Sequence, residues 1–577
     1  MEHEIVLRDA YKEYTLDQDK VLSPEETVRR FKEKLKKVDL DILEETVRID
    51  KGRLGIPVYF SVCGRDAREI IGTKKQMGKG GTPQQAEASA VMELAERFSF
   101  FSFCKNEDNF FVDTYKNVKE KALSFEKIAQ SVHDDSSDLD AAEKVFSEIP
   151  LKWTRGYNLT LQRPVLIPFD WFFAINEFNG PSAGNCTEEA ILQGICEVVE
   201  RHVSSIVSRE RRAVPGIDLS SSIDPVAKEL IEKYGKVGVQ LFANDFSLDT
   251  GIPTVGILAY DPSTFPERSE IVWTAGTTPN PDKALIRALT EVAQLAGDFD
   301  TLSKYVASGL PKFQDLNDAV FITHPEKTVR LDDLPDLSNE NIRVEIENCI
   351  EALSRVGLEI LEINVTHPVL EIPAYYTIIP GAHFRERAAG TSVGMFAARL
   401  ISEAVDKQWA IERLEWMKTL MPNRYYVDFY LGLCRIALGD YDSALRHLKE
   451  SIDEGPDEEN IATIYSYMAV ALKEMGRFQE ALSALEHAEK ADAERTDVYN
   501  LMGYCYFKLG EHEKAIKCFE KVLALDPTSA IDYANIGSNY RELGEKDLAI
   551  EYYRIALELD PSIDFARASL QKLLGGQ

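Results

Sequence analysis

One helical pattern occurs three times in this chain, and every copy carries carboxylates. The copies are Pro83–Arg97, Thr187–Arg201 and Pro281–Leu295. In register, one column holds Glu93, Glu197 and Glu291 (197 − 93 = 104; 291 − 197 = 94), and a second holds Glu96, Glu200 and Gln294. Three acid-bearing helices of one design predict a single site built from converging copies. Because clustered carboxylates repel one another unless a cation neutralises them, a hard cation such as Mg²⁺ is the expected occupant.

Glycine-rich turns precede the first two copies. GKGG occupies residues 78–81, and SAGN occupies residues 182–185. Such turns let backbone N–H groups and a helix N-terminus meet phosphate oxygens. Carboxylates facing these turns therefore suit Mg²⁺ bound to a triphosphate. Arg287, in the column of Ser89 and Gln193, predicts a further phosphate contact.

A solvated helix face is the alternative explanation for any single copy, because E-x-x-E-R also forms intrahelical ion pairs. Repetition in register favours an internal site instead. So do the apolar residues on other faces of the same helices, such as Val91, Leu94, Ile191 and Ile195. Internal carboxylates require partners, so we expect these acids to bind something.

Composition excludes several classes of function. The chain has 577 residues and a formal net charge of −30, which argues against general attraction to nucleic acid or to anionic membrane. The N-terminus lacks the apolar segment of a secretion signal, and no run of eighteen apolar residues predicts a membrane span. The eight cysteines form no CxxC pair, so a zinc or redox centre is not expected. These features together predict a cytoplasmic protein.

The first part of the chain alternates strand-like and helical segments, which predicts an α/β or α+β domain over residues 1–412. Ser23–Lys37 is typical of an amphipathic helix with Ser23 as its N-cap. The acidic segment His133–Lys144 predicts a loop. Strands are expected at Ile56–Gly64, Pro164–Phe169, Gly238–Ala243, Ile252–Ala259, Ile271–Ala275, Leu358–Val365 and Ala374–Ile379.

Residues 413–577 predict an all-α solenoid instead. Gly476, Gly510 and Gly544 recur every 34 residues, and LALDP and LELDP mark repeat ends. A 34-residue helix–turn–helix with small residues at fixed positions resembles the tetratricopeptide repeat. Four copies and a final helix form a credible stack, because a lone repeat cannot bury its apolar face. Such arrays usually bind a protein segment or another subunit.

Several motifs of the first domain resemble the YcaO family. They are GKG followed by SAVMELAER, then NGPSAGNCTEEAILQGICEVVER, ALIRALTEVAQ and IIPG. The resemblance covers roughly residues 15–410 and implies a three-fold-like domain that binds ATP and Mg²⁺. In the best-known members a nucleophile adds to a backbone carbonyl, and ATP phosphorylates the resulting oxyanion. Loss of phosphate then leaves an azoline, an amidine or a thioamide.

The resemblance also assigns roles to residues. It implies five carboxylate ligands for Mg²⁺: Glu93, Glu96, Glu189, Glu197 and Glu200. It implies that the same five contact the nucleotide, together with Lys20, Thr27, Asn185, Arg201 and Arg287. Four of the acids are the expected catalytic residues: Glu93, Glu96, Glu197 and Glu200.

Two departures from the family bear on the substrate. The chain ends in LLGGQ rather than in the proline-rich tail of peptide-cyclising members, and it has Ala296 where many members have arginine. It is therefore more similar to the founding, non-azoline branch, which the resemblance links to methylthiolation of a ribosomal protein. We expect an ATP- and Mg²⁺-dependent enzyme that activates a backbone amide or assists modification of a protein substrate. The repeats would recruit a partner or form a homodimer.

Two alternatives stay open at this point. One is a non-catalytic scaffold that senses nucleotide while its repeats bind a client protein. The other is a peptide heterocyclase that forms azolines or thioamides. A complete set of internal acids favours the enzyme over the scaffold, because a scaffold has no need of them.

Overall fold

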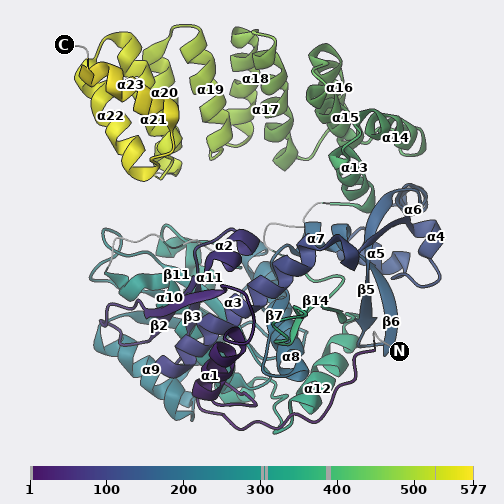
Figure 1. The fold of residues 1–577 in the computed structure, drawn as a ribbon, viewed down its shortest axis with the longest axis vertical. Coiled ribbons are helices and arrows are strands. Elements are labelled where there is room, and N and C mark those ends of the chain that lie inside the picture. Colours follow the sequence, from purple (N-terminus) through teal and green to yellow (C-terminus); the bar gives the residue numbers. More distant parts are fainter. Residues whose placement is uncertain (1–3, 301–304, 306–308, 385–390, 527, 576–577) are drawn as a thin grey trace. The chain divides into compact units, whose positions relative to one another are not determined.

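The computed structural model of the protein describes residues 4–300, 305, 309–384, 391–526 and 528–575 (Figure 1). The chain forms two compact units. The first comprises residues 1–139 and 147–393, and the second comprises residues 140–146 and 394–577. The boundary at residue 412, inferred from sequence, stays a prediction about where the first domain ends. Among the described residues, no helix combines the length and hydropathy that a bilayer-spanning segment needs.

The first unit contains three sheets. The three-stranded sheet comprises β1 (Leu43–Arg48), β2 (Val58–Cys63) and β3 (Lys75–Lys79), in that order. The five-stranded sheet has the order β11 (Val272–Thr277), β10 (Thr254–Tyr260), β9 (Gln240–Asp245), β8 (Gly216–Asp218), β12 (Thr328–Arg330). The six-stranded sheet has the order β4 (Phe111–Thr114), β5 (Pro150–Asn158), β13 (Leu361–Asn364), β14 (Ala374–Ile378), β7 (Pro181–Ala183), and β6 (Arg163–Pro168) pairs with β5. Neighbouring strands are antiparallel except β8 and β12, which are parallel.

Each sheet carries one of the three repeated helices, which are α3 (Pro83–Lys105), α8 (Thr187–Arg209) and α10 (Pro281–Ala296). A three-residue connection joins each helix to the strand before it, which is β3, β7 or β11. Each helix packs on the sheet of that strand and also against the edge strand of another sheet. The second contacts are α3 with β7, α8 with β11 and α10 with β3. The contacts therefore close a cycle, and the three helices meet in the middle of the unit.

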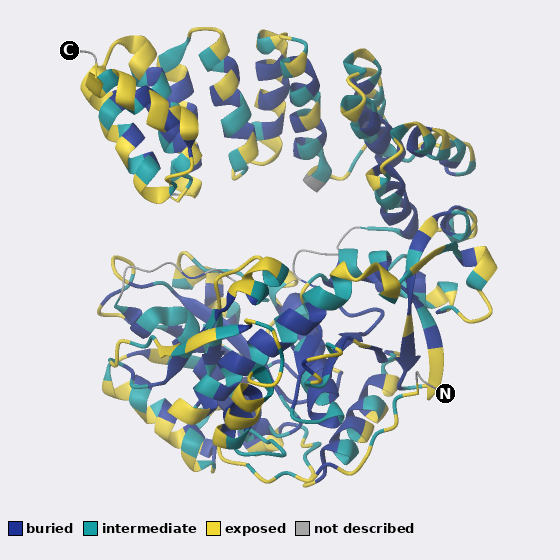
Figure 2. Ribbon diagram, viewed as in Figure 1, coloured by how far each residue is buried: buried dark blue, intermediate teal, exposed yellow. Residues whose placement is uncertain are grey.

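The small residues repeated along these helices allow the strands to approach closely. A methyl group built on Gly78 of β3 would lie 2.1 Å from the backbone nitrogen of Ala90. One built on Gly276 of β11 would lie 2.6 Å from the backbone nitrogen of Ala288. The equivalent contacts in two copies show that the sequence repeat is also a structural repeat. Much of each helix is buried as a result (Figure 2).

The remaining helices of the first unit surround this centre. They are α1 (Pro24–Leu35), α2 (Arg65–Ile71), α4 (Tyr115–Val118), α5 (Phe125–Ser131), α7 (Phe169–Asn176), α9 (Pro225–Lys236), α11 (Val320–Thr323) and α12 (Ile342–Arg355). The predicted N-cap of α1 is confirmed, because the Ser23 hydroxyl accepts a hydrogen bond from the Glu26 N–H at 3.3 Å. All seven predicted strand segments contain a strand.

Two local predictions are wrong. The predicted loop His133–Lys144 runs into helix α6 (Leu139–Ser147), because Ala142, Val145 and Phe146 share one face and are buried. The two predicted glycine-rich turns are shorter than expected, because Gly78 and Lys79 belong to β3, and Ser182 and Ala183 belong to β7. Side-chain burial explains the helix, whereas pairing of β3 with β2 and of β7 with β14 extends the two strands into the turns.

The second unit is helical and confirms the predicted repeats. It begins with α13 (Val393–Glu403) and α14 (Lys407–Leu420). Antiparallel pairs follow: α15 (Tyr425–Ala437) with α16 (Tyr441–Asp453), α17 (Glu458–Glu474) with α18 (Phe478–Ala491), α19 (Thr496–Lys508) with α20 (His512–Leu525), and α21 (Ala530–Leu543) with α22 (Lys546–Leu559), before the final α23 (Asp564–Gly575). Gly503 of α19 lies directly under Phe519 of α20, since a methyl group there would be 2.6 Å from the ring.

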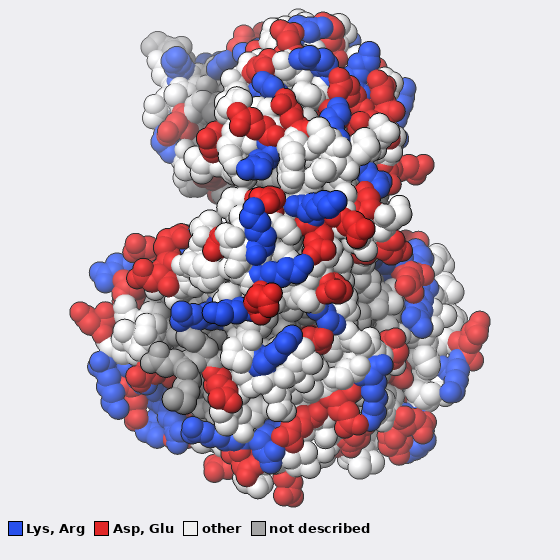
Figure 3. Space-filling view, turned by 90° about the vertical axis from the view of Figure 1, so that its right-hand side faces the viewer, with Lys and Arg blue, Asp and Glu red and all other residues white. Residues whose placement is uncertain are grey.

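The surface charge matches the composition. Figure 3 shows one face of the molecule, on which Lys and Arg side chains are interspersed with Asp and Glu. A face on which both signs are interspersed lacks the extended positive field that attracts polyanions.

Candidate nucleotide site

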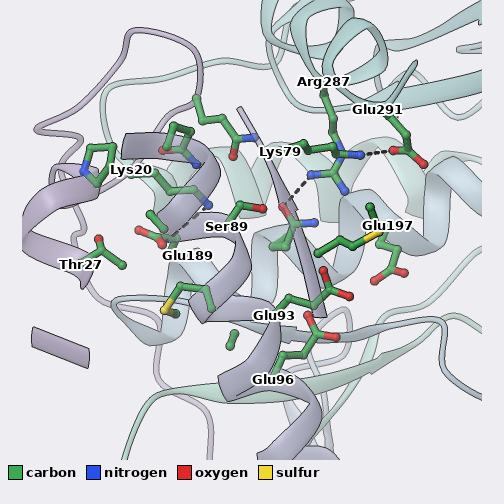
Figure 4. A pocket seen from close by; sticks show the side chains of 18 of the residues that line it. Lys20, Thr27, Lys79, Ser89, Glu93, Glu96, Glu189, Glu197, Arg287 and Glu291 are labelled. Carbon is green, nitrogen blue, oxygen red and sulfur yellow. Dashed lines mark hydrogen bonds and ion pairs between the residues drawn. The ribbon is translucent and has the colours of Figure 1, made fainter. Parts of the chain in front are cut away.

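A cavity of about 360 Å³ lies where the three repeated helices meet. All ten residues expected to bind nucleotide line it: Lys20, Thr27, Glu93, Glu96, Asn185, Glu189, Glu197, Glu200, Arg201 and Arg287. Figure 4 shows labelled side chains from all three helices directed into one space. The structure therefore brings the predicted set together, while the role of each residue stays a prediction.

Glu200 of α8 is bound by the third copy, through the end of β11 and through α10. Its Oε2 accepts a hydrogen bond from the Thr277 N–H at 3.1 Å and lies 3.3 Å from Nε of Arg287. Arg287 also donates to Oε1 of Gln193 at 3.2 Å, so two members of one sequence column touch. Burial raises the pKa of Glu200, and Arg287 opposes that rise. These bonds fix the guanidinium of Arg287 at the edge of the cavity.

Glu93, Glu96 and Glu197 are less well compensated. Oε1 of Glu96 lies 3.4 Å from Nε of Arg97, and Oε1 of Glu197 lies 3.8 Å from Nη2 of Arg201, so both ion pairs stay on one helix. Burial raises the pKa of Glu93 and raises that of Glu96 well above its ordinary value. The charge of Glu197 adds to both shifts. Three acids that repel one another in a buried cavity have the donor chemistry of a site for a divalent cation.

Glu189 lies at the other end of the cavity and has protein partners. It accepts hydrogen bonds from the Val21 N–H at 3.2 Å and from the Asn185 Nδ2 at 3.0 Å, and Lys20 Nζ lies 3.7 Å from its Oε1. Thr27 donates to the Ser23 carbonyl at 3.0 Å. These contacts tie the N-terminal segment to α8. They favour an anchoring role for Glu189, and its predicted role as a metal ligand stays untested.

Sequence reasoning missed one pair in this cavity. Lys79, the last residue of β3, forms an ion pair with Glu291 of α10, and both line the cavity. Burial lowers the pKa of Lys79, and the charge of Glu291 opposes that effect. For Glu291, burial acts to raise the pKa, but Lys79 and Arg201 outweigh it and the pKa is lowered. The signal for Glu291 was present, because it shares the column of Glu93 and Glu197.

The charge balance of the cavity suits a metal–phosphate ligand. Its described lining has six carboxylates, which are Glu93, Glu96, Glu189, Glu197, Glu200 and Glu291. It also has five cationic side chains, which are Lys20, Lys79, Arg97, Arg201 and Arg287. Carboxylates hold divalent cations, and lysine and arginine hold phosphate oxygens. A nucleotide with Mg²⁺ meets both needs, whereas a lone anion or a lone cation would leave one half of the cavity unmatched.

Comparison with known proteins identifies two families. Residues 77–383 match the family described as YcaO cyclodehydratase, ATP- and Mg²⁺-binding. Residues 425–494, 496–529 and 533–563 match tetratricopeptide repeats.

Individual relatives agree with the family match. An uncharacterized protein of Methanothermobacter thermautotrophicus is 30% identical over 379 residues, which cover 62% of this chain and 93% of that protein. The ribosomal protein S12 methylthiotransferase accessory factor YcaO of Escherichia coli is 28% identical over 297 residues, covering 47% of this chain and 48% of that protein. A solved heterocyclase in complex with substrate and cofactor gives a TM-score of 0.53 at 23% identity, over 66% of this chain and 55% of that chain. This last likeness shows the fold.

Proposed function

The chain belongs to the YcaO family, since the family match spans more than half of it, and we propose that it is an enzyme that uses ATP and Mg²⁺ to activate a backbone amide of a protein substrate. The domain is of the ATP- and Mg²⁺-binding kind. The relatives bear names as different as heterocyclase and methylthiotransferase accessory factor, so the shared element is the nucleotide domain. The substrate and the chemical outcome belong to the proposal.

This proposal rests on one observation, which is that acidic and basic side chains lie on different sides of the cavity. Glu93, Glu96 and Glu197 form an acidic side, on which Glu96 and Glu197 pair with arginines of their own helices. Arg287, fixed by Glu200 and Gln193, stands on a basic side. We place Mg²⁺ on the acidic side and the phosphates between the two sides. A purely structural salt-bridge network would pair these three acids too with cations from other elements, as Glu200 is paired with Arg287 and Glu291 with Lys79.

The chemistry follows from this placement. When bound, ATP with Mg²⁺ supplies a phosphoryl group that converts the poor leaving group of an amide, its oxygen, into a good one. The residues of the chain position the nucleotide and neutralise the charge on its phosphates. Arg287 and Arg201 balance negative charge on the phosphates. Lys20 and Thr27 hold the far end of the nucleotide, and the buried walls of α3 and α8 exclude water that would otherwise accept the phosphoryl group.

The second unit supplies the means of recruiting a protein. Tetratricopeptide arrays present extended surfaces built from stacked helices. Tyr467 of α17 and Tyr504 of α19 are more than one-third exposed, although large aromatic side chains usually lie inside. We propose that this unit binds the protein substrate or its carrier. A homodimer formed through the same helices would appear as a doubled mass in light scattering of the full chain.

The test compares cells of the source organism that lack the chain and are supplied with the wild type, Glu197→Ala or Glu87→Ala. Glu87 is the matched control, because it lies on α3 and bonds Lys32 and Thr46 outside the cavity. Mass spectrometry of intact proteins should find one protein that loses water or exchanges an oxygen for sulfur with the wild type and the control only. A methylthio group in place of that change would assign the assisting role. Identical proteomes in all strains, with ATP turnover unaffected by Glu197→Ala, would overturn the proposal.

A further inference from the structure

The strands before the three helices end at equivalent residues: Lys79, Ala183 and Thr277. Their spacings are again 104 and 94 residues (183 − 79 = 104; 277 − 183 = 94), the same as those of the helices. Because β3 packs against α10, β7 against α3 and β11 against α8, each position stands beside the acid-bearing helix of another copy. The cavity thus has three corresponding corners, each formed by a strand end and the acid-bearing helix beside it.

The three corners are filled differently. At the corner of α10, the Lys79 side chain crosses to Glu291 and forms an ion pair (Figure 4). At the corner of α3, Ala183 is too short to offer a charge to Glu93. At the corner of α8, Thr277 offers its backbone N–H, which bonds Glu200 and carries no full charge. Of the three strand ends, Lys79 is therefore the one that brings a cation to its corner, and Glu197 pairs instead with Arg201 of its own helix.

We propose that Lys79 is a built-in cation of the nucleotide site: its ammonium takes the corner that metal takes beside Glu93 and Glu197, and it binds a phosphate oxygen of ATP. This inference rests on the proposed function. An ammonium has three N–H donors, and Glu291 is the one hydrogen-bond partner of Lys79 among the described residues. Donors therefore remain for a phosphate. Lys79 also lines the cavity together with Arg287, so two basic side chains face the same space.

A built-in cation differs from a metal ion in its consequences. Mg²⁺ arrives and leaves with the nucleotide, whereas Lys79 is present in every state. Glu291 holds the flexible lysine stem in one place, which makes Glu291 a positioning residue rather than a metal ligand. The sequence repeat then predicts three acids of one kind, of which two hold metal and the third holds Lys79.

The binding test uses the full chain with ATP and with adenosine, in saturating Mg²⁺, by calorimetry. The variants are Lys79→Met, the double variant Lys79→Met/Glu291→Gln, and the control Lys75→Met. Lys75 is exposed on the same strand and lies over the Phe60 ring, outside the cavity. The double variant removes both charges of the ion pair. It therefore tests ATP binding even where Lys79→Met alone fails to fold.

We expect the double variant to bind ATP about tenfold more weakly or worse, since a hydrogen bond to a charged group is lost. Adenosine binding should change by less than about twofold, because no phosphate is involved. Lys75→Met should bind both ligands as the wild type does. If the double variant binds ATP like the wild type, the ion pair is only structural and the inference is overturned. An equal loss for adenosine and ATP would overturn it too.

A second measurement tests the equivalence of the corners. Lys79→Ala makes its corner resemble that of Ala183, so manganese titration followed by paramagnetic resonance should find one more Mn²⁺ per chain in the presence of a non-hydrolysable ATP analogue. Lys79→Ala/Glu291→Gln should return to the wild-type number. An unchanged number in Lys79→Ala would overturn the inference. A wild type that binds no ATP at all would instead contradict the proposed function.

Discussion

Both units of the molecule are built from repeated helices, but they repeat different things. In the first unit the repeated positions include Glu93, Glu197 and Glu291, which face a shared cavity. In the second unit the repeated positions include Gly503 and Gly537, each covered by an aromatic ring of the next helix. The repeated residues therefore line a shared cavity in one unit and allow close helix packing in the other. The residue type that recurs tells the two cases apart.

Two buried acids, one in each unit, differ in their hydrogen-bond and ion-pair partners. Asp428 of α15 is buried, with Lys418 Nζ at 2.6 Å and His447 Nδ1 at 2.9 Å. Glu362 of β13 is buried, and its Oε1 accepts a hydrogen bond from the Thr377 hydroxyl at 2.8 Å, while its Oε2 has no hydrogen-bond partner among the described residues. Asp428 therefore has cationic partners on two neighbouring helices, whereas Glu362 has a hydroxyl donor and no cation among its described hydrogen-bond partners.

The largest effect should come from a double variant of the acidic side, which distinguishes a loss of ATP binding from a loss of folding stability. Glu93→Ala combined with Glu197→Ala should weaken ATP binding with Mg²⁺ by roughly a hundredfold or more, because two charged ligands are lost. The same variant should unfold at a temperature no lower than the wild type, since two buried charges that repel each other are removed. Calorimetric titration and thermal unfolding measure both. Unchanged ATP affinity would show that the repetition in the first unit is also only packing.

The next effect concerns the paired acid of the second unit. Burial acts to raise the pKa of Asp428, but His447 and Lys418 outweigh it and lower the pKa below 3.8. The carboxylate therefore stabilises the fold above pH 3.8, and that stability is lost as the pH falls through the lowered pKa. Asp428→Asn should cost about 3 kcal/mol at neutral pH and almost nothing in acid. Denaturant unfolding at both pH values measures this, with ATP affinity as the control that should not change.

The unpaired acid of the first unit should show the opposite pH dependence. Burial raises the pKa of Glu362 well above its ordinary value. Its contribution to stability is present below pH 4.5 and is lost as the pH rises toward the raised pKa, by about 1.4 kcal/mol per pH unit. Glu362→Gln carries no ionisable group, so its stability relative to the wild type should improve steadily with pH. A constant difference between the two across this range would contradict the assignment.

The smallest effect compares two glycines that allow close packing. A methyl group at Gly194 of α8 would lie 2.1 Å from the Thr377 hydroxyl, and one at Gly503 would lie 2.6 Å from the Phe519 ring. Overpacking opposes the helix propensity of alanine, so each Gly→Ala change should cost about 1 kcal/mol in net stability. Only Gly194→Ala should also weaken ATP binding, because α8 carries the site. Equal effects of both variants on ATP affinity would remove the distinction between the units.

Much of the central architecture could be predicted because it is local. The helices α3 and α10 begin at the predicted residues, since Thr82 and Asn280 cap them and proline follows each cap. Seven of the ten predicted nucleotide residues lie on the repeated helices and reach one cavity because the repeated pattern places equivalent faces toward one centre. Helix α6 escaped prediction because its acidic composition hid a short apolar face.

The pair of Lys79 and Glu291 could not be predicted in the same way. The two residues are 212 positions apart, and their contact depends on which sheet edge each helix meets. Strand β5 is a similar case, because PLKWTRGYN shows no clear alternation and gains its burial from pairing with β4, β6 and β13. Contacts set by the order of strands lie beyond what periodicity and capping specify.

In the proposed nucleotide site, acids of the repeated helices hold the metal. The most direct test of this assignment is a crystal of the full chain grown with Mn²⁺ and a non-hydrolysable ATP analogue, measured for anomalous scattering. Manganese should lie about 2.1–2.2 Å from carboxylate oxygens of Glu93, Glu96 or Glu197, with the phosphates toward Arg287. Manganese bound elsewhere, or a nucleotide outside this cavity, would contradict the assignment of the site to the repeated helices.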